Sequence, residues 1–186
     1  MSAGFDGHII KIRIKMELPE KFDVLIITLS DRAHSGEYQD LSGPRIKERL
    51  SDYFKEQNWI GDFNLTLIPD DSAILKEILK SAGNVYSMIF TTGGTGIGPR
   101  DITVETVRPL LSKEIPGIME YIRMKYGSEK PNALLSRGVA GILGEALIYT
   151  LPGSLRAVDE YMTEILKTLG HILSMKYGID THAKDQ

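Results

Sequence analysis

The sequence predicts an α/β fold of three layers, in which helices cover both faces of a mostly parallel central sheet. The short apolar run 24–27 is typical of a strand buried on both faces, and predicted strands such as this one and 147–151 alternate with segments of helical periodicity. The length of 186 residues suits one domain, and 42% hydrophobic residues suffice for its core. We expect this domain at 22–178, after an N-terminal extension (1–21) with one strand and before a short tail (179–186).

Composition excludes several classes of protein. The chain has no cysteine, which rules out disulfides, thiolate metal sites and a cysteine nucleophile. The formal net charge of −3 gives neither the basic excess of a nucleic-acid binder nor an acidic tail. No apolar stretch approaches the length of a transmembrane helix, and the first residues lack a leader pattern. We therefore expect a soluble, cytoplasmic protein that binds neither membrane nor nucleic acid.

The first predicted elements are two strands of different character. In residues 8–16 isoleucine and methionine alternate with lysine and arginine, which indicates an edge strand with one buried face. Its basic row either attracts an anionic partner or, as we favour, blocks aggregation at the sheet edge. The continuous apolar run 24–27 then predicts a buried strand that ends in a polar loop over 32–42.

The middle of the chain predicts two helices around a further strand. Pro44, expected at a first helical position, begins a helix that continues to about Asn58. A strand follows near 63–68. The sequence Pro-Asp-Asp-Ser at 69–72 ends that strand and caps the next helix, which Gly83 stops.

The rest of the chain repeats this alternation. A strand at 85–90 precedes helices at 103–111 and 117–126, and a strand at 147–151 precedes a final helix from Leu155 to about 177. The long apolar stripe of that helix indicates a core face or, alternatively, part of a subunit interface. In such folds ligands bind beyond the carboxyl ends of the strands, where the strand order reverses, so the residues after each strand are the candidate site.

A glycine-rich loop follows the strand 85–90. It reads Thr91-Thr92-Gly93-Gly94-Thr95-Gly96-Ile97-Gly98, and its four glycines permit close ligand approach and the positive φ values that turn successive N–H groups toward one anion. The threonine hydroxyls add donors. The loop lacks the Gly-Lys-Ser/Thr of a Walker motif and the spacing of the dinucleotide motif. It is either a phosphate cradle, which we favour, or a tight turn without a ligand.

Charged residues at two strand ends predict a magnesium site. Arg100 suits bidentate phosphate contact, and the adjacent Asp101 either holds Mg²⁺ among phosphates or caps the helix beginning near Thr103. Asp70 and Asp71 present the same choice, because one helix cap explains one of them but not obviously both. Asp70 and Asp101 could share one metal ion.

Further polar residues lie at other element boundaries. Two interpretations of Ser30, Asp31 and Arg32 are equally well supported by the sequence: these residues bind a polar ligand, or they stabilise a long loop. We interpret two further segments mainly as turns and, with less weight, as anion sites: Ser136-Arg137-Gly138 and Pro152-Gly153-Ser154.

Taken together, these motifs resemble the molybdopterin adenylyltransferase branch of the MogA/MoaB molybdenum cofactor biosynthesis family. The resemblance covers about residues 23–173 and rests on the order and spacing of the following segments: Thr28-Leu-Ser-Asp-Arg32, Asp40-x-Ser-Gly-Pro44, Ile68-Pro-Asp70, Thr91-Thr-Gly-Gly-Thr-Gly96 with Pro99-Arg-Asp101, Pro116-Gly117, Leu135-Ser-Arg137 and Leu151-Pro-Gly153.

The resemblance implies both a reaction and an assembly. Molybdopterin and MgATP give adenylyl-molybdopterin and pyrophosphate, in a homotrimer that makes transient contact with the protein that inserts the metal. Asp70 and Asp101 would be the magnesium-dependent catalytic carboxylates. The implied nucleotide-phosphate residues are Thr92, Gly93, Gly94, Thr95, Gly96 and Arg100. The implied lining of the nucleotide and pterin pockets is Ser30, Asp31, Ser136, Arg137, Pro152, Gly153 and Ser154.

Two features separate the branches of this family. The last motif, Pro152-Gly153-Ser154-Leu155, lacks the second proline of Pro-Gly-x-Pro and is more similar to the MoaB branch, whereas the intact Pro99-Arg100-Asp101 favours an active adenylyltransferase. The main alternative is a MoaB-type pterin-binding protein without transferase activity. A nucleotide-processing competence-damage protein and a receptor-clustering scaffold are further alternatives, which we do not favour because such chains are usually longer or fused.

Overall fold

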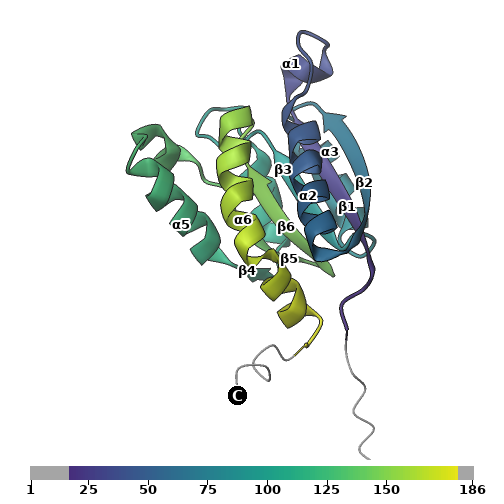
Figure 1. Ribbon diagram of the computed structural model, residues 1–186. Helices are drawn as coiled ribbons and strands as arrows, with labels where there is room; N and C mark the ends of the chain where they lie inside the picture. Colours follow the sequence, from purple (N-terminus) through teal and green to yellow (C-terminus); the bar gives the residue numbers. More distant parts are fainter. Residues whose placement is uncertain (1–16, 180–186) are drawn as a thin grey trace, which may run out of the picture.

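The computed structural model describes residues 17–179, and within them the chain forms a six-stranded sheet in the order β2-β1-β3-β6-β5-β4 (Figure 1). The strands are β1 (Lys21–Leu29), β2 (Ile60–Ile68), β3 (Met88–Thr92), β4 (Lys113–Glu114), β5 (Ala140–Leu143) and β6 (Ala146–Leu151). The first three and β6 are parallel, while β4 and β5 add an antiparallel edge. The prediction of a mostly parallel sheet is confirmed. The predicted strand at 8–16 lies outside the described residues.

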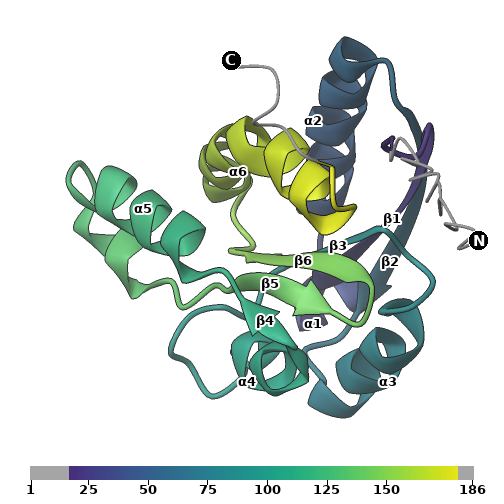
Figure 2. The ribbon, with the colours of Figure 1, turned by 90° about the horizontal axis from the view of Figure 1, so that it is seen from below.

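Helices cover both faces of this sheet, which confirms the three layers (Figure 2). The helices are α1 (Asp31–His34), α2 (Ser42–Gln57), α3 (Ser72–Ala82), α4 (Thr103–Val107), α5 (Pro116–Gly127) and α6 (Leu155–Lys176), with the 3₁₀ turns η1 (Arg108–Leu110) and η2 (Pro131–Leu135). One core lies between the sheet and α2, α5 and α6, and the other lies between the sheet and α3 and α4. None of the helices in the described range is long and apolar enough to cross a membrane.

The continuous apolar sequence of β1 follows from burial on both faces. Phe22, Val24 and Ile26 belong to the core under α2 and α6, whereas Leu25 and Ile27 belong to the core under α3. Because successive side chains of a strand point to opposite faces, a strand between two helical layers needs apolar residues at every position.

Several predicted boundaries are wrong, for identifiable reasons. Helix α2 begins at Ser42, so Pro44 is its third residue and not its first, and the segment predicted as loop after β1 contains the short helix α1. The strand predicted from Val85 begins at Met88, because the N–H of Val85 donates to the carbonyl of Ala82 in the turn that ends α3. The helix predicted for 103–111 stops being α-helical at Val107, and a 3₁₀ turn containing Pro109 follows.

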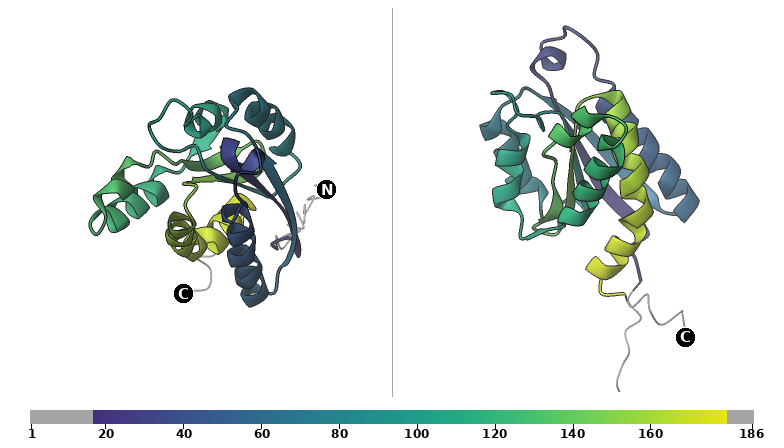
Figure 3. Two further views of the ribbon diagram at one scale, coloured as in Figure 1. Left: turned by 90° about the horizontal axis from the view of Figure 1, so that it is seen from above. Right: turned by 90° about the vertical axis from the view of Figure 1, so that its left-hand side faces the viewer.

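The topology creates a crevice at one edge of the sheet. From β1 the chain crosses to β2 on one side and later returns to β3 on the other, so the strand order reverses between β1 and β3. The carboxyl ends of β1, β2, β3 and β6 meet at the edge from which α1 projects, at the top in Figure 1 and facing the viewer in the left view of Figure 3. Open α/β sheets bind ligands at such a position.

Candidate functional site

A cavity of ≈ 640 Å³ lies at the point where the strand order reverses. Its walls come from the segments that follow β1, β2, β3 and β6. The predicted site residues in this first cavity are Ser30, Asp31, Asp70, Gly93, Gly94, Arg100, Asp101, Gly153 and Ser154. The structure therefore brings together residues from four strand ends. The most distant of them in the sequence, Ser30 and Ser154, are 124 positions apart.

A second cavity of ≈ 390 Å³ adjoins the first and is formed mainly by the loop after β3, by η2 and by the start of α6. Its predicted site residues are Gly94, Thr95, Gly96, Asp101, Ser136, Pro152, Gly153 and Ser154. Four residues line both cavities: Gly94, Asp101, Gly153 and Ser154. Two ligands held in the two cavities would therefore meet at these four residues.

The glycine-rich loop keeps its carbonyl groups occupied and its N–H groups available. The carbonyl oxygens of Gly93, Gly94, Thr95 and Gly96 each accept a hydrogen bond from Thr103 or Arg137. In the described part of the chain, the backbone N–H groups of Gly94, Thr95 and Gly96 donate to no protein acceptor. Gly93 and Gly94 have φ values of 101° and 63°, the conformation in which consecutive N–H groups can converge on an anion.

A network of Asp31, Asp70 and Arg100 crosses the first cavity. The backbone N–H of Asp31 donates to Oδ2 of Asp70 and the N–H of Asp70 donates to Oδ1 of Asp31, both at 3.0 Å. Arg100 donates from Nε and Nη2 to the Asp31 carboxylate at 2.9 and 2.8 Å. These bonds hold the pKa of Asp31 below its usual value, Arg100 being the larger cause. By contrast, burial raises the pKa of Asp70, and the charges of Asp31 and Asp101 raise it further.

The two adjacent aspartates after β2 have different environments. Asp71 is the N-cap of α3, since its Oδ1 accepts from the N–H groups of Ala73 and Ile74 at 2.8 and 3.1 Å. Asp70 lines the first cavity instead. Asp101 does not cap α4, because the N-cap of this helix is Ile102, which makes no side-chain hydrogen bond. Instead, Oδ2 of Asp101 accepts a hydrogen bond from the N–H of Gly98 at 2.7 Å. Helix capping therefore explains Asp71 and leaves Asp70 and Asp101 for the cavity.

The carboxylates of Asp70 and Asp101 each keep one oxygen that could bind a magnesium ion. Each accepts a hydrogen bond with Oδ2, and the other oxygen of each accepts none from the described part of the chain. Within residues 17–179 no three or more His, Cys, Asp or Glu side chains are arranged to hold a metal ion by themselves. One or two carboxylates completed by substrate phosphates are the usual protein contribution to a magnesium site.

Two predicted site residues line neither cavity. The hydroxyl of Thr92 is buried and donates to the carbonyl of Pro152 at 2.9 Å, which joins the ends of β3 and β6. The guanidinium of Arg137 donates from Nε to the carbonyl of Gly96 at 2.7 Å and pairs with Glu105. The Thr92 side chain therefore joins two strand ends, and the Arg137 side chain binds a carbonyl group of the glycine-rich loop.

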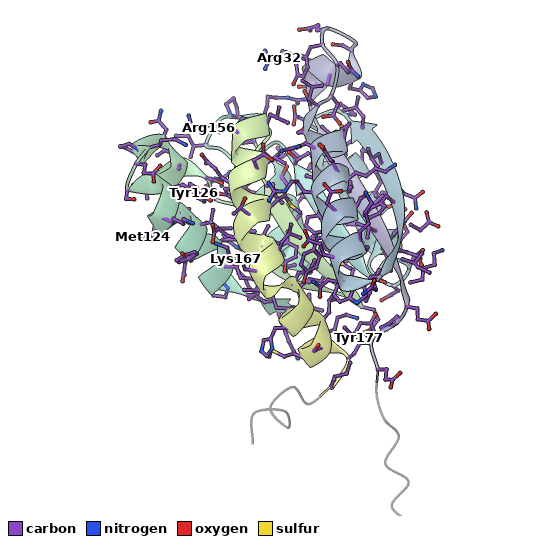
Figure 4. All side chains as sticks on the ribbon, viewed as in Figure 1. Arg32, Met124, Tyr126, Arg156, Lys167 and Tyr177 are labelled. Carbon is purple, nitrogen blue, oxygen red and sulfur yellow. The ribbon has the colours of Figure 1, made fainter. Side chains whose placement is uncertain are left out.

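Several lining residues were not predicted from the sequence, among them Tyr38 in the first cavity and four residues in the second. Tyr38 lies in the first cavity, with its hydroxyl 2.8 Å from the Ser30 hydroxyl and the Arg32 guanidinium 5.3 Å from its ring centroid. The others belong to the second cavity: Lys130, Arg156, Glu160 and Tyr161. Figure 4 shows Arg32 on α1 and Arg156 at the upper end of α6. The sequence did contain a signal for two of them: Arg156 and Glu160 are one turn apart near the beginning of a helix that follows a strand end.

The sequence matches a known family over most of its length. A family model described as "probable molybdopterin binding domain" matches residues 25–171. A molybdopterin adenylyltransferase of Pyrococcus furiosus is 38% identical over 173 residues, covering 86% of this chain and 94% of the relative.

Longer relatives match over a part of their length. The molybdenum cofactor synthesis protein cinnamon of Drosophila melanogaster is 36% identical over 152 residues, which cover 81% of this chain but 25% of cinnamon. The chain thus spans about a quarter of that protein, and 23% of a Dictyostelium discoideum gephyrin.

Solved structures agree with the sequence comparisons. A crystal structure of the molybdopterin biosynthesis enzyme MoaB from Thermus thermophilus has a TM-score of 0.73 and 38% identity, and the match covers 84% of this chain and 97% of that one. The cavities therefore lie in a fold that this chain shares with molybdopterin biosynthesis proteins. The chain belongs to the molybdopterin-binding domain family of molybdenum cofactor biosynthesis.

Proposed function

We propose that this protein is a molybdopterin adenylyltransferase, which transfers AMP from ATP to molybdopterin. In this reaction an oxygen of the molybdopterin phosphate attacks the α-phosphorus of ATP, the bond from that phosphorus to the bridging oxygen of the β-phosphate breaks, and pyrophosphate leaves. The observation that carries the proposal is the pair of adjoining cavities that share Gly94, Asp101, Gly153 and Ser154. A transfer between two substrates requires that their reacting groups meet, and these residues surround the meeting point.

The residues around the meeting point supply what nucleotidyl transfer needs. The N–H groups of Gly94, Thr95 and Gly96 lie on preorganised backbone and would stabilise the negative charge of the phosphates. Arg100 would add a bidentate contact once a phosphate competes with Asp31 for its guanidinium. Asp70 and Asp101 would hold Mg²⁺, which when bound neutralises phosphate charge. No covalent enzyme intermediate is required.

The names of the relatives support the same activity. Relatives from Pyrococcus furiosus and Helicobacter pylori that cover 82–86% of this chain are both named molybdopterin adenylyltransferase. We also propose a homotrimer, a cytoplasmic location, where ATP and Mg²⁺ are available, and a transient contact with the protein that inserts the metal. Sedimentation equilibrium would test the trimer, whose mass would be about three times 20.7 kDa.

Pyrophosphate release tests the activity. The purified protein with molybdopterin, ATP and Mg²⁺ should release pyrophosphate, and Asp101→Asn should reduce release by at least about 100-fold while molybdopterin still binds. The matched control is Asp71→Asn, which keeps a good helix cap outside the cavities and should retain turnover.

Two results would contradict the proposal. Normal turnover by Asp101→Asn would remove this carboxylate from the mechanism. A wild-type protein that binds molybdopterin but releases no pyrophosphate would instead be a pterin-binding protein of the MoaB type.

A further inference from the structure

Arg137 binds carbonyl groups along the outer side of the glycine-rich loop. Arg137 donates from its backbone N–H to the carbonyl of Thr95 at 3.0 Å and from Nε to the carbonyl of Gly96 at 2.7 Å. Its Nη2 also reaches the carbonyl of Asp101 at 3.3 Å. Arg137 therefore joins both ends of the segment from Thr95 to Asp101, which carries available N–H groups at one end and a cavity carboxylate at the other.

Glu105 holds this arginine in place. Its Oε1 pairs with Nη1 of Arg137, and its Oε2 accepts from Nη2 at 3.2 Å, so the contact is bidentate. Glu105 lies in the first turn of α4, the helix that Thr103 ties to the loop through bonds to the carbonyls of Gly93 and Gly94. Glu105 lines neither of the two substrate cavities.

An isolated exposed ion pair contributes little to stability, and the Glu105 side chain is 57% exposed. This pair differs because the same guanidinium donates two further hydrogen bonds, to the carbonyls of Gly96 and Asp101, and the backbone N–H of the same residue donates a third to Thr95. A free arginine side chain has many rotamers, and the bidentate contact removes most of them. The pair is thus placed to affect the geometry of the loop more than the stability of the fold.

We propose that Glu105 is a positioning residue, which acts through Arg137 to fix the glycine-rich loop and Asp101 for phosphoryl chemistry. With its carbonyl groups occupied on the outer side, the loop presents its N–H groups to the cavities. Loss of Glu105 releases the guanidinium, and the segment from Thr95 to Asp101 gains freedom. The expected loss of activity rests on the proposed adenylyl transfer, whereas the expected gain in loop freedom does not.

The kinetic test compares Glu105→Ala, Arg137→Ala and the double variant. We expect Glu105→Ala to lower kcat by about 10- to 100-fold, because small misplacements of reacting groups cost rate, while the KM for molybdopterin changes by less than about threefold. Since Glu105 acts through Arg137, the double variant should be no slower than Arg137→Ala alone. Glu105→Gln, which keeps one acceptor oxygen, should restore part of the rate and also serves if Glu105→Ala is too unstable to purify.

The matched control is a second exposed Arg–Glu pair. Nη2 of Arg108 lies 3.3 Å from Oε1 of Glu114, and the two side chains are 54% and 36% exposed. Neither residue lines either cavity. Glu114→Ala should keep the wild-type kcat. Wild-type turnover in Glu105→Ala, or effects of the two single variants that multiply in the double variant, would overturn the proposal.

Amide hydrogen exchange provides a test that needs no activity. In Glu105→Ala the hydrogen-bonded amides of Gly98, Asp101 and Arg137 should exchange faster than in the wild type, while Glu114→Ala leaves their exchange unchanged. Unchanged exchange in Glu105→Ala would overturn the positioning role. If the wild type releases no pyrophosphate, the proposed function fails, and the exchange experiment still decides the role of Glu105.

Discussion

Single residues of the glycine-rich loop show how backbone geometry and ligand binding impose the same requirement. Gly93 has a φ of 101°, and a Cβ at this position would lie 2.2 Å from the carbonyl oxygen of Leu29. At Gly96 a Cβ would lie 2.8 Å from Oδ2 of Asp101. The first glycine is therefore needed to let the chain turn after β3, and the second leaves room for a proposed catalytic carboxylate.

Replacement of Gly93 tests this at the residue scale. Gly93→Ala should lower the free energy of unfolding by at least about 2 kcal/mol, because the side chain meets backbone in a conformation that L-residues avoid. Urea denaturation measures this change.

Gly117→Ala is the matched control for this variant. A Cβ at Gly117 meets nothing within 4 Å, and the residue lies in the first turn of α5, so stability should stay equal or rise by up to about 1 kcal/mol. Equal stabilities for the two variants would show that the turn at Gly93 tolerates a side chain.

At the scale of elements, most helices and strands could be predicted and the antiparallel edge could not. Helix α6 carries a long apolar stripe, which predicts both its existence and its buried face. Strand β5 has four residues, one of them Gly141, and β4 has two. Such segments are too short to show a period, and Gly141 is explained only by its neighbour: a Cβ there would lie 2.4 Å from the carbonyl oxygen of Lys113.

Helices α5 and α6 are joined by a buried carboxylate. The Glu164 side chain is 3% exposed and accepts hydrogen bonds from Lys125 at 2.7 Å, Tyr126 at 3.1 Å and Lys167 at 2.7 Å. Burial alone would raise the pKa of Glu164, but these three donors outweigh burial and hold the pKa below its ordinary value. The ionised form is therefore the one that the fold stabilises.

We expect Glu164→Gln to lose about 1.5–3 kcal/mol of stability at pH 7, since hydrogen bonds to a charged group are lost. A carboxyl group with a depressed pKa in the folded state stabilises above its unfolded pKa and loses this contribution as the pH falls through the folded value. The difference between wild type and variant should therefore shrink below about pH 4.5.

Denaturation at several pH values measures this difference, with Glu120→Gln on the exposed face of α5 as the control, expected within about 0.5 kcal/mol throughout. A difference that does not depend on pH would assign the loss to packing instead of charge.

For the whole molecule, the two cores share one sheet and should unfold together. Leu169 lies in the core under α6 and Leu79 lies in the core under α3, and both are fully buried. Trp59, the single tryptophan, packs against the first core, with its ring centroid 4.9 Å from that of Phe22. Its fluorescence therefore reports directly on one layer only.

Leu79→Ala tests this coupling from the opposite layer. The variant should lose about 2–5 kcal/mol, as should Leu169→Ala, and Trp59 fluorescence should detect both losses in one transition that coincides with circular dichroism. The exposed Leu65 on β2 provides the control, since Leu65→Ala should lose less than about 1 kcal/mol. A Trp59 transition that Leu79→Ala leaves unchanged would show that the layers unfold separately.

The sequence by itself determined the layered fold, the glycine-rich loop and the carboxylates at the strand ends. These features are local: apolar runs, helical periodicity and turn chemistry are written in neighbouring residues. The sequence alone did not decide, however, whether Asp70 or Asp71 caps α3.

Only the tertiary structure decided which residues share a cavity. Contacts such as that of Arg137 with Glu105, or of Arg100 with Asp31, join residues 32 and 69 positions apart. They depend on the order of the strands and on the direction of each side chain, which no local pattern records. For the same reason, Thr92 and Arg137 look like ligand residues in the sequence, but in the fold Thr92 bonds the carbonyl of Pro152, Arg137 bonds the carbonyl of Gly96, and neither lines the two cavities.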